Sequence, residues 1–536
     1  MRRCAPVPTY FQLRKNVPLL ISLFCENNDD DILMLNWGKA KGGIILVFIL
    51  AFLFLAADGP RIIQFPPRST HIFRQSDCLA YTKTYYQRHS GFFTPAGYNL
   101  IGKGGRVVSE FPILYYISAQ LCRLFGFHYW IIRGVTMLCY IIGLYYLLLC
   151  CRLWIKDLFL ALFPVIILAS TPYYFFYAVN YLPNIPAISF SFAGLYYMLR
   201  HAQSNAPRHV AISSIFFTLA CLLKPTDGGL IWLAYLATAC TVFIKGENRN
   251  KRVFPLLVSA GFIVFCAFLW YLFVKWYNAV NGNNINLQGL YPIWEMGRDD
   301  MARTFQFRIL SSGREVFQHI ILLLLLVSFL IIYIVKWKSL NPFLRIFTMW
   351  LIIGAAIYTP LWFKAFLIHD YYQLIFTIPA VFLCITIINW YENTTAWPSG
   401  RYSRYVVKGV LAVLLIISIY HNQAIQLNRY ADSNMAVNNP AIYELEPYLR
   451  KIGISEADSV LSVPDFSPNI TLAIFGNPGY ASDLFGPGIF NAGYCKAHNI
   501  KYMIITDARY IHDPAYKPYT SKLIGEFKGI HIYNIQ

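Results

Sequence analysis

Charged side chains are scarce in this sequence. Only 13% of its 536 residues are Asp, Glu, Lys or Arg, whereas 57% are hydrophobic. A soluble domain carries roughly 25% charged residues. Apolar runs of roughly 17–25 residues cross a bilayer as helices, and runs of about this length recur along the chain. The shortage of charge therefore excludes an ordinary soluble protein and predicts a polytopic membrane protein.

Acidic residues are scarcer than basic ones, 26 against 45, and the formal net charge is +19. In a membrane protein, part of such an excess orients the spans and does not by itself indicate nucleic acid. A site for single-stranded nucleic acid combines a basic groove with exposed aromatic side chains. No soluble stretch has that pattern, so we predict no nucleic-acid partner.

The sequence also lacks the residue spacings of metal sites. Its 12 cysteines include no CxxC pair. Most lie in apolar runs, as Cys139, Cys150, Cys151 and Cys266 do, where a thiol behaves as a small hydrophobic group. No His, Asp and Glu residues have the spacing of a zinc or calcium site. The prediction is that the protein uses no metal and no other cofactor.

Eleven apolar segments predict an α-helical polytopic protein with about 11 transmembrane helices. They are approximately 42–57, 128–149, 158–174, 182–199, 210–223, 230–244, 254–274, 316–335, 343–362, 371–390 and 406–420. The apolar run before Met34 is too short to span a membrane. Because Met34 stands just before two lysines and the first span, we expect it to be the true start.

Basic residues in alternate short loops predict the orientation. Since such loops stay in the cytoplasm, the N-terminus (residues 1–41) is predicted to be cytoplasmic and the C-terminus to be outside. The basic loops lie near 152–156, 200–208, 245–252, 336–345 and 401–404.

The tail, residues 421–536, is predicted to form a small extracytoplasmic α/β domain. The stretch ELEPYLRKIG has helical spacing, and DSVLSVPD, KYMIITD and IHIYNI are short β-type runs between turn residues. The tail shows no catalytic constellation, so we expect it to stabilise or dock. The remaining domain, 42–420, contains a large first outer loop at 58–127.

This first outer loop is too long for a simple connection, and long loops are usually functional. It is rich in basic residues, which suit a lipid phosphate because arginine matches phosphate oxygens with two donors. A simpler interpretation is that these side chains anchor interfacial helices to headgroups. They are Arg61, Arg68, Arg74, Lys83, Arg88, Lys103, Arg106 and Arg123, against the acids Asp58, Asp77 and Glu110.

Two acids of this loop are candidates for catalysis. Asp77 follows Arg74 within one turn of a predicted helix, and Glu110 lies just before a stretch that Pro112 initiates. Each alone could be an acid at the start of a helix. Together, beside arginines at membrane level, they could deprotonate an acceptor hydroxyl while a lipid phosphate leaves.

The stretches FRQSDCLAYTKTYYQ and GYNLIGKGGRVVSEFPILYYISAQLCRLFG resemble the first outer loop of bacterial GT-C glycosyltransferases. This superfamily includes the protein O-mannosyltransferases and the lipid A aminoarabinose transferase, and the resemblance is to glycosyltransferase family 39. The segments YLPNIPAISFSFAGLYYM, LLKPT and HDYYQLIFTIP are similar to later family segments in the same order. The resemblance covers roughly 42–390 and is strongest over 71–126.

The resemblance implies an enzyme that transfers a sugar from a polyprenyl-phosphate donor to a glycan, lipid or protein acceptor. It implies a site on the outer, periplasmic face of the bacterial inner membrane. The family's catalytic acid falls on Asp77 and its second acid on Glu110. The groups that the family gathers near the donor phosphate fall on Lys224, His369 and Tyr372, and Arg74 is expected to join them.

Other residues define the limits of the resemblance. Asn184 stands where relatives often carry an aspartate, so an acidic role is lost there. Glu295 and Asp299, in the loop YPIWEMGRDDMART, are candidates for the rim of an acceptor site or simply for a solvated loop. Lys224 could equally be an interfacial lysine, and the HDYY turn an aromatic belt.

Two other functions stay open. A lipid-linked sugar transporter, or flippase, would carry mid-span charges and related halves, and the sequence shows neither. A non-catalytic protein of envelope glycan assembly would use its tail as the working part. The sequence fixes neither the sugar, the acceptor nor the stereochemistry.

Overall fold

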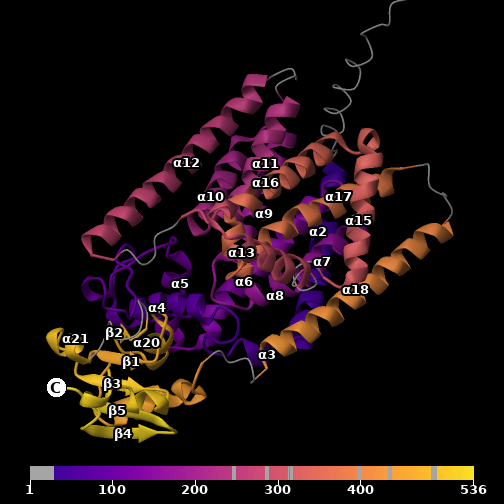
Figure 1. Ribbon diagram of the computed structural model, residues 1–536. Helices are drawn as coiled ribbons and strands as arrows, with labels where there is room; N and C mark the ends of the chain where they lie inside the picture. Colours follow the sequence, from indigo (N-terminus) through magenta and orange to yellow (C-terminus); the bar gives the residue numbers. More distant parts are fainter. Residues whose placement is uncertain are drawn as a thin grey trace, which may run out of the picture.

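The protein is a bundle of long helices with a small sheet domain at one end, as the computed structural model shows (Figure 1). The structure describes residues 29–243, 249–283, 289–311, 313, 318–394, 401–431, 437–483 and 492–536. The predicted N-terminal region therefore lies mostly outside the described residues.

Each predicted span coincides with a helix or a pair of helices. The bundle helices are α2 (Asp29–Ala56), α6 (Tyr129–Arg152), α7 (Leu158–Ala169), α8 (Pro172–Ala178), α9 (Asn184–Ser204), α10 (Pro207–Leu223), α11 (Pro225–Phe243), α12 (Arg249–Val280), α15 (Ile320–Val335), α16 (Pro342–Phe366), η5 (Asp370–Phe376) with α17 (Thr377–Asn393), and α18 (Arg401–Arg429). Short elements η2 (Ile293–Glu295), α13 (Arg298–Arg303), η3 (Thr304–Ser311) and η4 (Trp337–Ser339) connect them.

Several of these helices suit a membrane. Among the described residues, five helical stretches are long and apolar enough to cross one, or six if the bent pair α7 and α8 counts as one span. The bend between α7 and α8 is 72°, and it falls where Pro172 opens the second helix, because proline restricts the residue before it to extended backbone. The polytopic helical class is confirmed, while the number of eleven and the orientation stay predictions.

The first outer loop folds into helices that pack beside the bundle. It contains α3 (Gly59–Ile62), α4 (Ile72–Arg88), η1 (Lys103–Gly105) and α5 (Ile113–Phe125). Helix α4 begins at His71, whose φ of 60° is left-handed. Most of α4 is buried, including its polar residues Asp77 and Lys83. A helix that is buried in this way needs hydrogen-bond partners for its polar side chains.

The predicted C-terminal α/β domain is present as a five-stranded mixed sheet of order β2-β1-β3-β5-β4. Its core strands β2, β1 and β3 are parallel, and β5 and β4 are antiparallel. The strands are β1 (Val460–Val463), β2 (Gly479–Ala481), β3 (Tyr502–Ile505), β4 (Leu523–Phe527) and β5 (Ile530–Asn534), with η7 (Pro440–Glu444), α19 (Leu445–Lys451), α20 (Ile470–Phe475), α21 (Ala492–Ala497), η8 (Ala508–His512) and η9 (Lys517–Tyr519) around them.

Two strands of the sheet were not predicted from the sequence. Strand β2 has only three residues, and β4 carries Gly525 beside a register irregularity, so neither shows a clear alternation. The domain also begins later than predicted, because helix α18 continues past residue 420 to Arg429.

The sheet domain is bonded to the first outer loop. The N–H of Leu100 donates to the carbonyl of Gly479 at 2.8 Å, and the N–H of Gly479 donates to the carbonyl of Tyr98 at 3.0 Å. The loop thus adds a short parallel bridge to the free edge of β2. Figure 1 shows the yellow sheet domain next to α4 and α5. An exposed sheet edge is thereby covered, and the loop and the tail form one unit.

Candidate active site

Arg74 joins the two candidate acids of the first outer loop. Its Nη1 lies 3.2 Å from Oδ2 of Asp77, one turn along α4, and its Nη2 lies 2.8 Å from Oε1 of Glu110. Asp77 is 2% exposed and Glu110 is 8% exposed. One guanidinium therefore bridges two buried carboxylates, an arrangement that uses its fixed fork of donors.

Glu110 receives two further hydrogen bonds. The Ser109 hydroxyl donates to Oε2, and the Tyr115 hydroxyl donates to Oε1 at 2.5 Å. Burial by itself would raise the pKa of Glu110, but Arg74 and these two hydroxyls outweigh burial and hold it below its ordinary value. Glu110 is therefore ionised at neutral pH.

Asp77 has the opposite balance. Burial raises the pKa of Asp77 above its ordinary value, although Arg74 and a hydrogen bond from Asn469 oppose the rise. Asn469 Nδ2 donates to Oδ1 of Asp77 at 2.9 Å. Two carboxylates that share one arginine thus have pKa values shifted in opposite directions, which is a frequent arrangement in acid–base sites.

A cavity of about 810 Å³ opens beside this pair. Its polar lining comes from the ends of several helices and from the first loop, and its apolar lining comes from the facing sides of α11 and α16. The polar residues include Arg74, Ser109, Glu110, Asn184, Lys224, Thr226, His369, Tyr371 and Tyr372, and the apolar ones include Leu230, Leu233, Ala234, Ala237, Trp350, Ile353, Ile357, Leu361 and Trp362.

The apolar part of the cavity is long and open at its side. It follows α11 from Pro225 to Ala237, a length of about 18 Å at 1.5 Å per helical residue. Leu233 and Ile357, which face it from α11 and α16, are 56% and 59% exposed. Of these two helices, α16 is long and apolar enough to cross a membrane. Exposed apolar side chains of this size often mark a site for an apolar ligand, and the opening lies between α11 and α16.

Lys224 places a positive charge in the polar part. Its Nζ lies 4.3 Å from the ring centre of Tyr371 and 4.6 Å from that of Tyr372. Burial lowers the pKa of Lys224, while the nearby carboxylates of Asp227 and Glu110 oppose this shift. The two aromatic rings hold the ammonium by cation–π attraction and leave its three N–H donors available for an anion.

His369 and Tyr372 line the same part of the cavity. Burial, with His71, Arg74 and Lys224 nearby, lowers the pKa of His369 to about 3. The imidazole is therefore neutral at pH 7 and can act as one donor and one acceptor. Its Nδ1 is buried and has no hydrogen-bond partner among the described residues, so it is available to a ligand.

Six predicted site residues thus gather in one place: Arg74, Asp77, Glu110, Lys224, His369 and Tyr372. Five of them line the cavity, whereas Asp77 lies behind Arg74 and is not part of the lining that the described residues form. The departure noted at Asn184 is also in the cavity, where its Nδ2 donates to Asp227.

Glu295 and Asp299 lie apart from this group. Glu295 is paired with Lys364 at 3.2 Å on the surface, and Asp299 opens the short helix α13. Neither lines the cavity formed by the described residues, but Tyr291 of the same loop does. Their place at the rim of an acceptor site stays a prediction.

Sequence reasoning missed the residues that hold this site in place. Asp370 bonds His71 Nε2 at 2.6 Å and Arg429 Nη2 at 3.1 Å, and Tyr177 also donates to it. These contacts fix the start of α4 against the end of α18. His71 is the first residue of the region in which the family resemblance is strongest, and Asp370 follows His369, so nearness to the predicted residues was the available signal.

The described residues form no evident metal site. No group of three or more His, Cys, Asp or Glu residues in the described ranges is arranged to hold a metal ion. The absence of a metal and of other cofactors stays a prediction.

Part of the chain matches a known protein family. Residues 109–271 match the model of the family described as dolichyl-phosphate-mannose-protein mannosyltransferase. The match begins at Ser109, next to Glu110, and includes Lys224. No curated protein sequence matches the chain.

Solved structures share the fold. ArnT from Cupriavidus metallidurans in the apo state has a TM-score of 0.58 and 13% identity, over 93% of this chain and 98% of ArnT. ArnT from the same organism bound to undecaprenyl phosphate has a TM-score of 0.59 and 13% identity, over 91% of this chain and 98% of ArnT. The arabinofuranosyltransferase AftD from Mycobacteria has a TM-score of 0.51 and 11% identity, over 91% of this chain and 41% of AftD.

Proposed function

We propose that this chain, which shares the fold of ArnT and matches the dolichyl-phosphate-mannose-protein mannosyltransferase family over residues 109–271, transfers a sugar from a polyprenyl-phosphate donor. The acceptor is a hydroxyl of a glycan, lipid or protein. The site lies at the outer, periplasmic face of a bacterial inner membrane, as the basic loops on the opposite side suggest.

One observation carries this proposal. A single cavity joins a group of cationic and polar side chains to an apolar groove that opens between α11 and α16. A sugar linked to a lipid phosphate has the same two parts: an anionic head and a long apolar chain. A soluble nucleotide sugar would need no lateral apolar opening.

The cationic residues suit the departing phosphate. As the glycosidic bond breaks, negative charge grows on the phosphate oxygen, and donors placed there in advance stabilise the transition state. Lys224 provides a full charge, Arg74 provides a second, and neutral His369 and the Tyr372 hydroxyl provide hydrogen bonds.

Asp77 suits the acceptor. A general base works best when its pKa lies nearer the operating pH, and burial raises the pKa of Asp77. Asp77 takes the proton of the acceptor hydroxyl, the oxygen bonds to the anomeric carbon, and the lipid phosphate leaves. Glu110, already ionised, holds Arg74 beside both the base and the phosphate.

The direct test is transfer by the purified protein in detergent. Radiolabelled polyprenyl-phosphate sugars are supplied with acceptor extracts, and labelled product is measured. Transfer or release of the labelled sugar supports the proposal. Folded protein that leaves every donor intact, while it moves labelled donor across a proteoliposome membrane, would instead support the transporter.

Gly229→Leu tests the lipid groove. Gly229 lines the cavity, and a Cβ at this position would meet no atom within 4 Å, so leucine would extend into the groove without backbone displacement. We expect the KM for a long-chain donor to rise about tenfold or more, because the loss of lipid burial costs about 0.8 kcal/mol for each CH₂ displaced. The KM for a donor with two isoprene units should change little.

Gly134→Leu is the matched control. Gly134 is also helical and also has open space at its Cβ, but it lies on α6 away from the cavity lining. Equal effects of the two substitutions, or no dependence on chain length, would contradict the proposed path of the lipid.

A further inference from the structure

The C-terminal domain reaches the first outer loop at Asp77 itself. Asn469, at the start of α20, donates from Nδ2 to Oδ1 of Asp77 at 2.9 Å, although the two residues are 392 positions apart. Asn469 is 6% exposed and Asp77 is 2% exposed. The contact is thus a buried hydrogen bond between a neutral amide and a carboxylate.

The orientation of this amide is fixed from its other side. Asn469 Oδ1 accepts from the backbone N–H of Tyr98 at 3.0 Å and from that of Asn99 at 3.2 Å. A rotated amide would turn its NH₂ toward two other donors and lose all three bonds. The NH₂ must therefore face Asp77.

The carboxyl group of Asp77 is oriented as a consequence. Its Oδ1 accepts from Asn469, and its Oδ2 accepts from Arg74, which lines the cavity. Because both partners are donors, both bonds favour the ionised carboxylate. Together they fix the plane of the carboxyl group, with Oδ2 on the side of Arg74.

We propose that the C-terminal domain completes the active site through Asn469, a positioning residue that holds Asp77 ionised and turns its Oδ2 toward Arg74. This inference rests on the transferase function proposed above. It assigns the tail a part in the reaction in place of the stabilising or docking role that the sequence suggested.

The turn that carries Asn469 is rigid. Asp465 accepts from the backbone N–H of Ser467 at 2.9 Å and from that of Thr471 at 2.9 Å, and the Ser467 hydroxyl accepts from the N–H of Ile470 at 2.8 Å. These bonds enclose Asn469 on both sides along the chain. A rigid support is what a positioning side chain requires.

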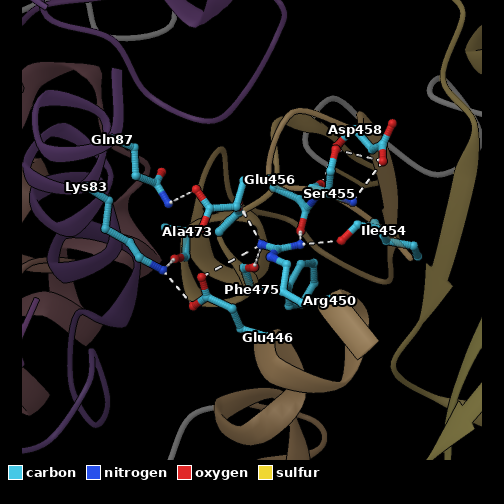
Figure 2. Close-up of polar contacts among 12 residues, drawn as sticks. Lys83, Gln87, Glu446, Arg450, Ile454, Ser455, Glu456, Asp458, Ala473 and Phe475 are labelled. Carbon is cyan, nitrogen blue, oxygen red and sulfur yellow. Dashed lines mark hydrogen bonds and ion pairs between the residues drawn. The ribbon is translucent and has the colours of Figure 1, made fainter. Parts of the chain in front are cut away.

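The junction between the tail and α4 is also well anchored (Figure 2). Lys83 Nζ donates to Glu446 Oε2 at 3.0 Å and to the carbonyl of Ala473 at 3.1 Å, and Gln87 donates to Glu456 at 3.0 Å. Lys83 lies on the same helix as Asp77, and Ala473 lies on α20, directly after its N-cap residue Asn469. The two helices are thereby held in fixed register at the point where Asn469 meets Asp77.

Asn469→Asp is the sharpest variant. Aspartate keeps the acceptor oxygen for Tyr98 and Asn99, but it replaces the NH₂ that faces Asp77 with an anionic oxygen. The charged groups that face Asp77 are then Arg74, Glu110 and the new carboxylate. A second anion disfavours ionisation of Asp77, so more of it is protonated at neutral pH and cannot accept a proton.

The measurement is the pH profile of kcat for sugar transfer. We expect the acid limb of the Asn469→Asp profile to move by about one pH unit or more to higher pH, with kcat at pH 7 reduced about tenfold or more and the donor KM unchanged. Asn469→Ala should move the limb in the same direction by less. Glu456→Ala, which removes a surface contact of the same junction, should leave the profile unchanged.

Different results separate the two proposals. Wild-type activity alone reports on the transferase function. An Asn469→Asp enzyme with the wild-type pH profile would overturn the positioning role. If the wild type transfers no sugar, infrared difference spectra between wild type and Asp77→Asn still give the pH at which Asp77 ionises. That pH must rise in an Asn469→Asp background, and an unchanged value would overturn the inference.

Discussion

Asp77→Asn is expected to lower kcat for sugar transfer by about 10²–10⁴-fold, the range that a positioned general base contributes. The amide keeps the size of the carboxyl group and can still accept a hydrogen bond through its oxygen. It cannot take a proton from the acceptor hydroxyl. Because Asp77 does not line the donor cavity, the KM for the donor should stay within about twofold.

The comparison with Glu110→Gln sharpens this prediction. Glu110 lines the cavity and holds Arg74 at 2.8 Å, so its loss should disturb donor binding as well as kcat. Asp58→Asn is the control, since Asp58 is an exposed acid of the same loop with its nearest cation 3.7 Å away. If the Asp77→Asn enzyme kept full activity while the Glu110→Gln enzyme was inactive, the general base would be Glu110 and not Asp77.

Lys224→Met should reduce kcat/KM for the donor by about 10- to 150-fold. A hydrogen bond to a charged group contributes about 1.5–3 kcal/mol, and this ammonium faces the cavity with its donors available. Methionine fills similar space and can still pack on Tyr371 and Tyr372. Steady-state kinetics over a range of donor concentrations measure the effect.

The thermal stability of this variant should change little. Two effects oppose each other here. Removing the ammonium relieves a desolvation cost, but it also removes the positive charge that favours the ionised forms of Asp227 and Glu110. Lys364→Met is the matched control, because Lys364 is a surface lysine that pairs with Glu295. Lys224→Met with unchanged kcat/KM would mean that the phosphate lies elsewhere in the cavity.

The sequence predicted the elements and the polar centre of this molecule for a physical reason. Membrane spans reveal themselves by length and hydropathy, which are local properties. Asp77, Glu110, Lys224 and His369 stood out because charged or titratable residues next to apolar spans are rare and costly. Their position beside one cavity follows from the alternation of the loops across the membrane.

The contacts between distant segments could not be predicted in this way. Asn469 is one polar residue among many in a soluble domain, and nothing local marks it as the partner of Asp77. The bridge between Tyr98, Leu100 and Gly479 likewise joins segments without a hydrophobic pattern. The separation of Asp77 from the cavity could not be predicted either, since its ion-pair partner Arg74 belongs to the lining formed by the described residues and Asp77 does not.

The bond between the first loop and the edge strand β2 has a consequence for the order of biosynthesis. The loop is translated hundreds of residues before Asn469 and Gly479 exist. Until then Asp77 lacks its amide donor and the loop lacks its sheet edge. On the transferase function proposed above, we therefore expect a ribosome-bound or truncated chain to transfer sugar more slowly than a chain whose synthesis has reached the tail.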